Sequence, residues 1–118
     1  MSEYHETDAE LSSEVRDLHR ALTSLKEEIE AVDWYNQRWS ASHDETLRSV
    51  LAHNRDEEIE HACMMLEWLR RNSPRWDEQL RKYLFKDGPI SDAADGGKHD
   101  SSGAAGSDLG IGSLRRPK

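Results

Sequence analysis

The feature that most constrains this chain is an apolar step of three and four residues in its N-terminal part. The step runs without a proline or glycine through Leu11, Val15, Leu18, Leu22, Leu25, Ile29 and Val32. Such a step places the apolar side chains on one face of an α-helix, as in helical bundles and coiled coils. The sequence therefore predicts a long first helix that continues to about residue 40.

A second long helix is expected after a short polar turn. Ser42 and Glu45 have the spacing of a capping box, which marks a helix N-terminus. The apolar step then resumes at Leu47 and Leu51 and continues to Leu69. Because the turn between the two helices is short, we expect them to lie antiparallel.

A short third helix is expected from about Arg75 to Phe85. Ser73-Pro74 marks its N-terminus, since proline is favoured at the first helical position, and Gly88-Pro89 marks its end. Two long helices bury only one stripe each, so their remaining apolar faces need a partner. The predicted fold class is all-α: an antiparallel two-helix hairpin plus a short C-terminal helix, which dimerises into a four-helix arrangement.

Two central turns of the second helix break the apolar pattern with residues that can bind a metal. Continuing the step from Leu51 places Glu58 and His61 where apolar side chains are expected. On the first helix, Glu28 and Tyr35 share the inward-facing stripe in the same way. Burial of a carboxylate or an imidazole is costly unless the group is paired or binds a metal. These positions are therefore candidates for a metal site.

Glu28 and the pair Glu58-x-x-His61 together form half of a di-iron ligand pattern. Carboxylate-bridged di-iron bundles use one glutamate from each of two helices and a Glu-x-x-His from each of the other two. Two copies of this chain would supply four carboxylates and two imidazoles, a mixed set that suits iron better than magnesium. The alternative is that Glu58 and His61 form a salt bridge in the helix seam and fix its register.

Charge and cysteine content argue against several classes of protein. The formal net charge is −8, and an acidic body of this kind repels nucleic-acid phosphates and attracts cations. Cys63 is the only cysteine, which excludes an intrachain disulfide and fits a reducing cytoplasm; we expect its side chain to be buried. No signal peptide is evident, and no apolar run approaches the ~20 residues that cross a bilayer. We expect a cytoplasmic protein that binds neither nucleic acid nor membrane.

The last part of the chain differs in composition from the helical region. Residues 91–108 are rich in Gly, Ala, Ser and Asp, which is typical of a flexible linker. Residues 109–118 combine spaced aliphatic side chains with two arginines, which after a linker indicates a short docking peptide. We therefore expect a helical domain over residues 1–90, a linker over 91–108 and a docking peptide over 109–118.

Several stretches of this sequence closely resemble the encapsulated ferritin family. They lie within residues 18–90 and are Glu27–Tyr35 (EEIEAVDWY), Leu51–Ala62 (LAHNRDEEIEHA), Leu66–Arg71 (LEWLRR) and Tyr83–Phe85 with Gly88–Ile90. The resemblance implies a ferritin-like arrangement of four helices, a ferroxidase centre on a two-fold interface and a ring of dimers, expected to be a decamer. It also implies an iron-storing cargo protein inside an encapsulin nanocompartment.

The resemblance implies a role for each of the candidate ligands. Glu28, Glu58 and His61 correspond to the ligands of the di-iron centre, with two iron ions at each dimer interface. Tyr35 corresponds to a tyrosine beside these ligands, where it would orient a carboxylate or handle protons. No ligand position departs from the family pattern.

Two outer groups of residues are also implied by the resemblance. Glu27 and Glu30 correspond to carboxylates through which metal reaches the centre, and an acidic funnel would concentrate iron(II) there. His53, Glu57 and Glu60 correspond to a peripheral cation site, for which calcium is the candidate ion. Their spacing gives only loose support, because a charged helix face is usually just solvated.

The segment Leu109–Arg116 resembles the targeting peptide that loads cargo into encapsulin shells. The predicted function is therefore oxidation of iron(II) to iron(III) by dioxygen. Two alternatives from other classes remain at this point. One is a metal-binding protein without catalytic turnover, and the other is a helical adaptor that docks through its C-terminal peptide.

Overall fold

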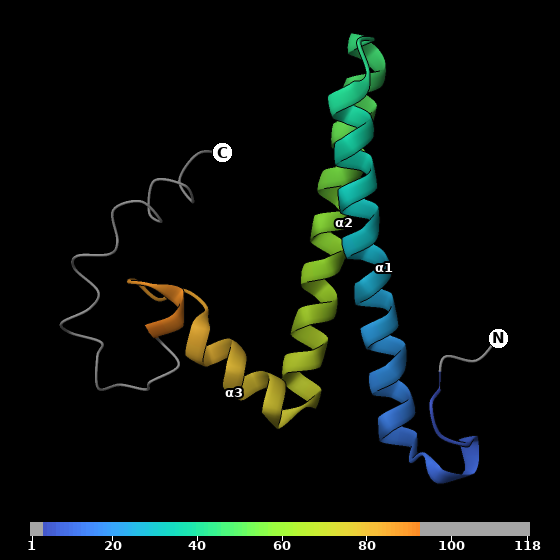
Figure 1. Ribbon diagram of the computed structural model, residues 1–118, viewed down its shortest axis with the longest axis vertical. Coiled ribbons are helices and arrows are strands. Elements are labelled where there is room, and N and C mark those ends of the chain that lie inside the picture. The colour runs from blue at the N-terminus through green and yellow to red at the C-terminus, as the bar shows by residue number, and fades with distance from the viewer. Residues whose placement is uncertain (1–3, 93–118) are drawn as a thin grey trace. The chain divides into compact units, whose positions relative to one another are not determined.

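The computed structural model describes residues 4–92, and their regular structure is entirely helical (Figure 1). A short 3-10 helix, η1 (Asp8–Glu10), precedes two long helices, α1 (Ser13–Ala41) and α2 (Glu45–Asn72), and a shorter one, α3 (Pro74–Tyr83). The described residues contain no strand. The predicted all-α class, with two long helices and a short third helix, is confirmed.

Helix α1 begins at the position that its capping residue dictates. The hydroxyl of Ser12 accepts a hydrogen bond of 3.1 Å from the backbone N–H of Val15, which satisfies one of the free donors of the first turn. Thr7 precedes only the short helix η1 and makes no side-chain cap. At the other end, the N–H of Ser42 donates to the carbonyl of Arg38 and closes the last turn.

Helix α2 is capped by a residue that the sequence analysis did not identify. The carboxylate of Asp44 accepts a hydrogen bond of 2.9 Å from the N–H of Leu47, and Ser42 Oγ accepts one of 3.2 Å from the N–H of Asp44. The predicted capping box of Ser42 and Glu45 is therefore wrong. Asp44 directly precedes the first helical residue, where its negative charge also complements the positive end of the helix dipole.

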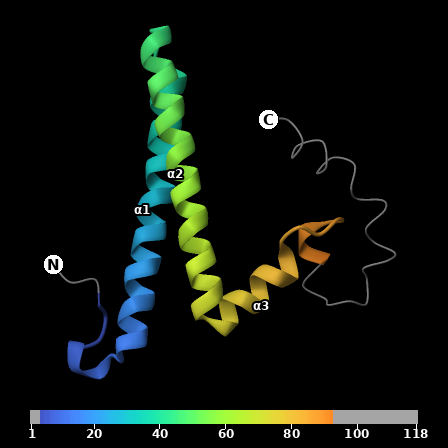
Figure 2. The same cartoon turned by 180° about the vertical axis from the view of Figure 1, so that it is seen from behind.

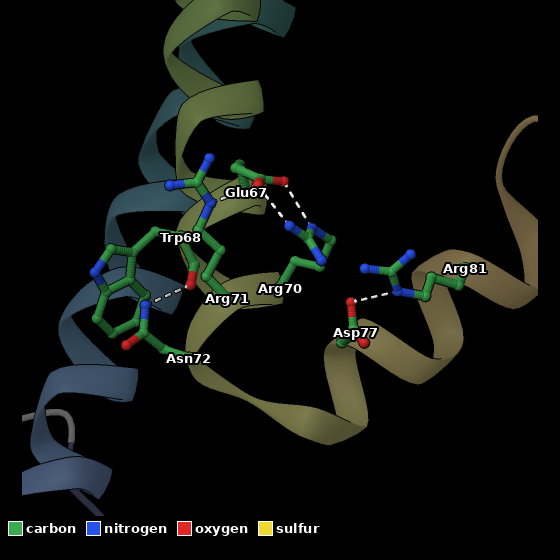
Figure 3. Close-up of polar contacts among 7 residues, drawn as sticks. All are labelled: Glu67, Trp68, Arg70, Arg71, Asn72, Asp77 and Arg81. Carbon is green, nitrogen blue, oxygen red and sulfur yellow. Dashed lines mark hydrogen bonds and ion pairs between the residues drawn. The ribbon is translucent and has the colours of Figure 1, made fainter.

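The last turns of α2 are held by an ion cluster that Figure 3 shows in close-up. The Glu67 carboxylate accepts two hydrogen bonds of 2.8 Å from the guanidinium of Arg70 and one of 2.6 Å from Arg71. The hydrogen bonds from Arg70, and to a smaller extent the one from Arg71, lower the pKa of Glu67 to about 2. The Asn72 amide donates to the carbonyl of Trp68 one turn earlier, at the end of the helix.

The chain divides into two compact units, and the second of them begins at Ser73, next to α3. The Ser73 hydroxyl accepts from the N–H of Trp76 at 3.4 Å, and Pro74 occupies the first turn, so the predicted start of this helix is confirmed. Its predicted end at Phe85 is wrong by two residues. Leu84, the residue after Tyr83, already has an extended backbone at φ -85 and ψ 145. Phe85 follows with φ 60, a left-handed conformation that cannot resume a right-handed helix.

The first unit is the helical hairpin of α1 and α2, which lie side by side and antiparallel in both views (Figures 1 and 2). Its core is thin: among the described residues the buried apolar side chains are Ala21, Leu25, Leu51 and Leu69. Leu69 alone among them has an exposed fraction of 0%. Two packed helices bury only the stripe between them, so the hairpin cannot cover its other faces by itself.

Many large apolar side chains consequently remain on the surface of the hairpin. They include Val15, Leu22, Ile29, Trp34, Leu47, Val50, Ile59 and Met64, each exposed by more than two fifths. Charged residues are interspersed among these apolar side chains. None of the helices in the described range is long and apolar enough to cross a membrane. Exposed apolar surface on this scale is typical of a helix pair that packs against another protein chain.

Candidate metal centre

Three ligand-type side chains converge between the two long helices. Glu28 comes from α1, whereas Glu58 and His61 lie one turn apart on α2, and their ligand atoms all lie within 4.8 Å of one another. Within residues 4–92, this is the only group of three or more histidine, cysteine or acidic side chains close enough to hold a metal ion. The structure thus brings together the three residues that the sequence predicted as ligands.

The distances within this cluster leave room for an ion between its members. The Nδ1 atom of His61 lies 3.6 Å from Glu28 Oε1 and 3.4 Å from Glu58 Oε1. Both separations exceed the usual length of a hydrogen bond. A metal bound to ligand atoms at about 2.0–2.2 Å fits between groups at such separations.

The cluster is partly open to solvent. The side chains of Glu28 and Glu58 are 26% and 24% exposed, and that of His61 is 47% exposed. A site that faces outward is accessible to an ion from solution, but it supplies ligands from only one side. Because a carboxylate-bridged pair of ions needs ligands around it, the open side is where a second set of ligands would have to lie.

Electrostatics at Glu28 are consistent with a site that attracts a cation. A hydrogen bond shared with Glu58, loss of solvation, and the charge of Glu58 raise the pKa of Glu28, and the nearby His61 opposes this effect only in part. Two carboxylates side by side repel each other when both are ionised. A bound divalent cation would remove that repulsion, so the donor set fits a metal.

Tyr35 lies two helical turns after Glu28 on α1 and is half-buried. The guanidinium of Arg38 lies 5.2 Å from the centre of its ring, a distance typical of a cation–π contact. Trp34, the adjacent residue, is 48% exposed. Because seven residues make about two helical turns, Tyr35 shares a face of α1 with Glu28, whereas Trp34 lies on the surface.

The outer candidate residues are only partly brought together. Glu27 and Glu30 are exposed on α1 and do not join the cluster of three ligands. His53 Nε2 lies 3.1 Å from Glu57 Oε2, and both side chains are more than half exposed. Glu60 is also exposed and is not part of a three-residue group in the described range.

Cys63 corrects one expectation from the sequence. It was expected to be buried, but its side chain is exposed on α2. The physical reason is that the hairpin buries only the stripe that faces α1, and Cys63 lies outside that stripe. The targeting segment Leu109–Arg116 and most of the linker, residues 93–108, lie outside the described residues.

A second group of side chains joins the two helices and was missed by the sequence analysis. Arg55 of α2 donates a hydrogen bond of 3.1 Å to Asn36 Oδ1 of α1, and its guanidinium lies 5.3 Å from the Trp39 ring centre. Arg48 also lies over Trp39, at 4.4 Å. The only signal in the sequence was the spacing of Asn36 and Trp39, which share one face of α1.

Comparison with known proteins identifies the family to which this chain belongs. The EncFtn-like family model matches residues 3–87, most of the chain. The chain therefore belongs to the EncFtn-like family. The predicted relationship to encapsulated ferritins is confirmed.

Individual relatives agree with this assignment. The chain is 57% identical to "Ferritin-like protein" of Thermotoga maritima, over 92% of this chain and 95% of that protein. It is 52% identical to "Encapsulated ferritin-like protein" of Rhodospirillum rubrum, over 94% of this chain and 86% of that protein. It is also similar to "Encapsulin nanocompartment cargo protein EncC" of Myxococcus xanthus, at 28% identity over 93% and 88% of the two chains.

A solved structure shows the same fold. The crystal structure of a protein from Nitrosomonas europaea matches with a TM-score of 0.73 and 57% sequence identity. The match covers 76% of this chain and 99% of the other.

Proposed function

We propose that this protein is a ferroxidase, which oxidises iron(II) to iron(III) with dioxygen at a di-iron centre shared by two copies of the chain. The observation that carries this proposal is the convergence of Glu28, Glu58 and His61, whose ligand atoms lie within 4.8 Å of one another. Membership of the EncFtn-like family supports it, because a relative at 52% identity is named as an encapsulated ferritin-like protein.

The second copy is required by the ligand count. One chain offers two carboxylates and one imidazole on an outward-facing site. A two-fold axis near His61 would place an identical set opposite the first and complete the pattern of four carboxylates and two imidazoles. The same contact would cover exposed apolar side chains of the hairpin, such as Trp34. We propose that such homodimers assemble further into a ring, a decamer by analogy with the family.

In this mechanism the carboxylates and the imidazole have different tasks. The carboxylates of Glu28 and Glu58 neutralise the charge of the incoming iron(II) ions, and His61 binds through a ring nitrogen. Two iron(II) ions held side by side can each give one electron to the same dioxygen molecule. Tyr35, on the same helix face as Glu28, would orient a carboxylate or accept a proton as the charge of the site changes.

The outer acidic residues would guide iron to the centre. Glu27 and Glu30 flank Glu28 on α1 and are exposed, so their charges raise the local concentration of cations near the site. His53, Glu57 and Glu60 form a further candidate cation site, with calcium as the proposed ion. The contact between His53 and Glu57 is the observation that supports this second site most directly.

We further propose that the protein is the cargo of an encapsulin nanocompartment in the cytoplasm. Residues 1–90 would form the ferroxidase domain, residues 91–108 a linker, and Leu109–Arg116 the peptide that docks on the shell. The name of the Myxococcus xanthus relative, an encapsulin cargo protein, supports this assignment. An open ring encloses no mineral, so the shell around it would store the iron(III).

Oxygen uptake after aerobic addition of iron(II) separates this proposal from its two rivals. A ferroxidase consumes oxygen at every addition of iron(II). A metal-binding protein without turnover takes up iron but does not accelerate oxygen consumption above the protein-free rate. A helical adaptor does neither, and either of the last two results would reject the proposed activity.

A further inference from the structure

A polar cluster on the hairpin links α1 and α2 and contains none of the candidate ligands. Arg55 is its centre: the Nη1 atom donates to Asn36 Oδ1, and the Nε atom donates to Asp56 Oδ1, both at 3.1 Å. The ring of Trp39 lies against the same guanidinium. The Arg55 side chain is only 24% exposed, so its position is defined by contacts with both helices.

This cluster lies on a different face of the two helices from the metal ligands. At 100° per residue, Asn36 is turned about 80° from Glu28 around the axis of α1, and Arg55 about 60° from Glu58 around that of α2. Asn36 and Arg55 line a groove of about 730 Å³ together with Ile29. None of the three ligands lines that groove.

The thin core of the hairpin cannot by itself define how the two helices are aligned. Apolar contacts are non-directional, and four buried side chains allow a small slide or roll of one helix against the other. A metal site tolerates little of such a slide or roll, because its ligand groups must lie within about 0.5 Å of their correct positions. A directional polar link between helices is the known means of fixing register.

We propose that Arg55 is a positioning residue for the metal centre. Its bonds to Asn36 on α1 and Asp56 on α2, with the Trp39 ring against it, fix the register and roll of the helices. That alignment brings Glu28 of α1 to Glu58 and His61 of α2. The inference rests on the proposed role of these three residues as metal ligands.

The test uses the full chain and cobalt(II) as the metal probe, and it measures the dissociation constant from the visible absorption of bound cobalt. Arg55→Ala and Asn36→Ala should each weaken cobalt binding by about tenfold, or ~1.4 kcal/mol. The double variant should bind cobalt no more weakly than Arg55→Ala alone, because the two residues act through one hydrogen bond. Asn36→Asp keeps an acceptor oxygen and should retain the wild-type affinity within about twofold.

Arg48→Ala is the matched control, since it removes the closer guanidinium from Trp39 but leaves the bond between Arg55 and Asn36 intact. We expect it to lower the thermal midpoint while the cobalt affinity stays within about twofold of wild type. If Arg55→Ala fails to fold, Asn36→Ala, an exposed position, carries the same test.

The possible outcomes separate this inference from the proposed function. If wild type binds cobalt but Arg55→Ala or Asn36→Ala binds equally well, the positioning role is rejected and the metal site stands. An equal loss of affinity in Arg48→Ala would also reject it, because the effect would then be general destabilisation. If wild type itself binds no cobalt, both the metal site and the positioning role are rejected.

Discussion

The imidazole Nδ1 of His61 lies 3.6 Å from Oε1 of Glu28, although the two residues belong to different helices. This contact across the hairpin joins Glu28 to the Glu58-x-x-His61 pair of α2 and so creates the three-residue cluster. In this cluster Glu28 lies beside a second carboxylate, Glu58, as well as the imidazole. Glu58 raises the pKa of Glu28, and His61 opposes this effect only in part.

Glu28→Gln should stabilise the metal-free protein at neutral pH. The neighbouring Glu58 raises the pKa of Glu28, so the folded state holds the Glu28 proton more tightly than the unfolded state does. The contribution to stability is therefore present at low pH and is lost as pH rises through the raised pKa, above 4.5. Thermal midpoints of the metal-free protein, measured from pH 4 to pH 8, should fall less in Glu28→Gln than in wild type.

The exposed Glu6, which lies outside the helices, provides the matched substitution for this comparison. Glu6→Gln should show the wild-type pH dependence. With cobalt(II) present the order of Glu28→Gln and wild type should reverse, because the variant has lost a ligand and gains less from the metal. A lower midpoint for metal-free Glu28→Gln at pH 7 would contradict the proposed repulsion.

Loss of any one ligand should impair iron oxidation strongly. Glu28→Ala, Glu58→Ala and His61→Ala each remove two ligands from a two-fold site, so the rate should fall by more than tenfold, or ~1.4 kcal/mol of barrier. Glu27→Ala and Glu30→Ala should act on iron uptake instead. Their effect should shrink at high salt, because exposed charges are screened. Initial rates of iron(III) formation at two salt concentrations check both statements, and equal rates in all five variants would reject the site.

Glu67 should contribute to the stability of α2 only above a low-pH window. Its hydrogen bonds with Arg70 and Arg71 lower its pKa to about 2, so the stabilisation is complete above the ordinary value of 4.5 and is lost as pH falls from 4.5 to about 2. Glu67→Gln should lower the thermal midpoint at pH 7, because it removes the charge that pairs with the two arginines. The decrease should be modest, because exposed ion pairs are screened by solvent. The difference from wild type, followed by circular dichroism, should vanish near pH 2. A constant difference across this range would contradict the assignment.

The sequence alone predicted the hairpin and the cluster because both depend on local periodicity. The apolar step defined the helices, and the same step placed Glu28, Glu58 and His61 on facing stripes. Errors arose where the local geometry of a helix end, or the lack of a packing partner, decides the outcome. Asp44 rather than Ser42 caps α2, the extended backbone of Leu84 ends α3, and Cys63 is exposed.

The link between Arg55 and Asn36 is a further feature that the sequence did not reveal. The two residues lie on different helices, and neither breaks a pattern on its own helix. Their contact depends on the roll of α1 against α2, which an apolar stripe does not specify. Such contacts require the packed hairpin to be known.

Deleting Leu109–Lys118 should separate targeting from chemistry. We expect the truncated protein to oxidise iron at the full-length rate within about twofold, because the proposed ligands all lie in the helical domain. The deletion should abolish co-purification with a co-expressed encapsulin, since many weak peptides on one ring hold the cargo by avidity. Fusion of residues 108–118 to an unrelated protein should load that protein into the shell. Packaging of the truncated form would show that another surface docks.

Metal should drive assembly if each chain holds half a site. Iron(II) under anaerobic conditions, or cobalt(II), binds the paired state and should favour the dimer and larger rings by mass action. Sedimentation velocity at low protein concentration, with and without metal, measures this effect. The His61→Ala variant should respond to metal far less than wild type. A monomer that persists in wild type under both conditions would contradict the shared site.

The most direct test of the central claim is oxygen uptake per chain, measured on aerobic addition of iron(II) over protein concentrations that span the monomer–dimer transition. A centre shared by two copies predicts that the rate per chain rises with concentration in proportion to the dimer fraction determined by sedimentation. It also predicts that oxygen consumption recurs at each addition of iron(II). Monomers that consume oxygen at the full rate per chain, or dimers that consume none above the protein-free rate, would contradict the account.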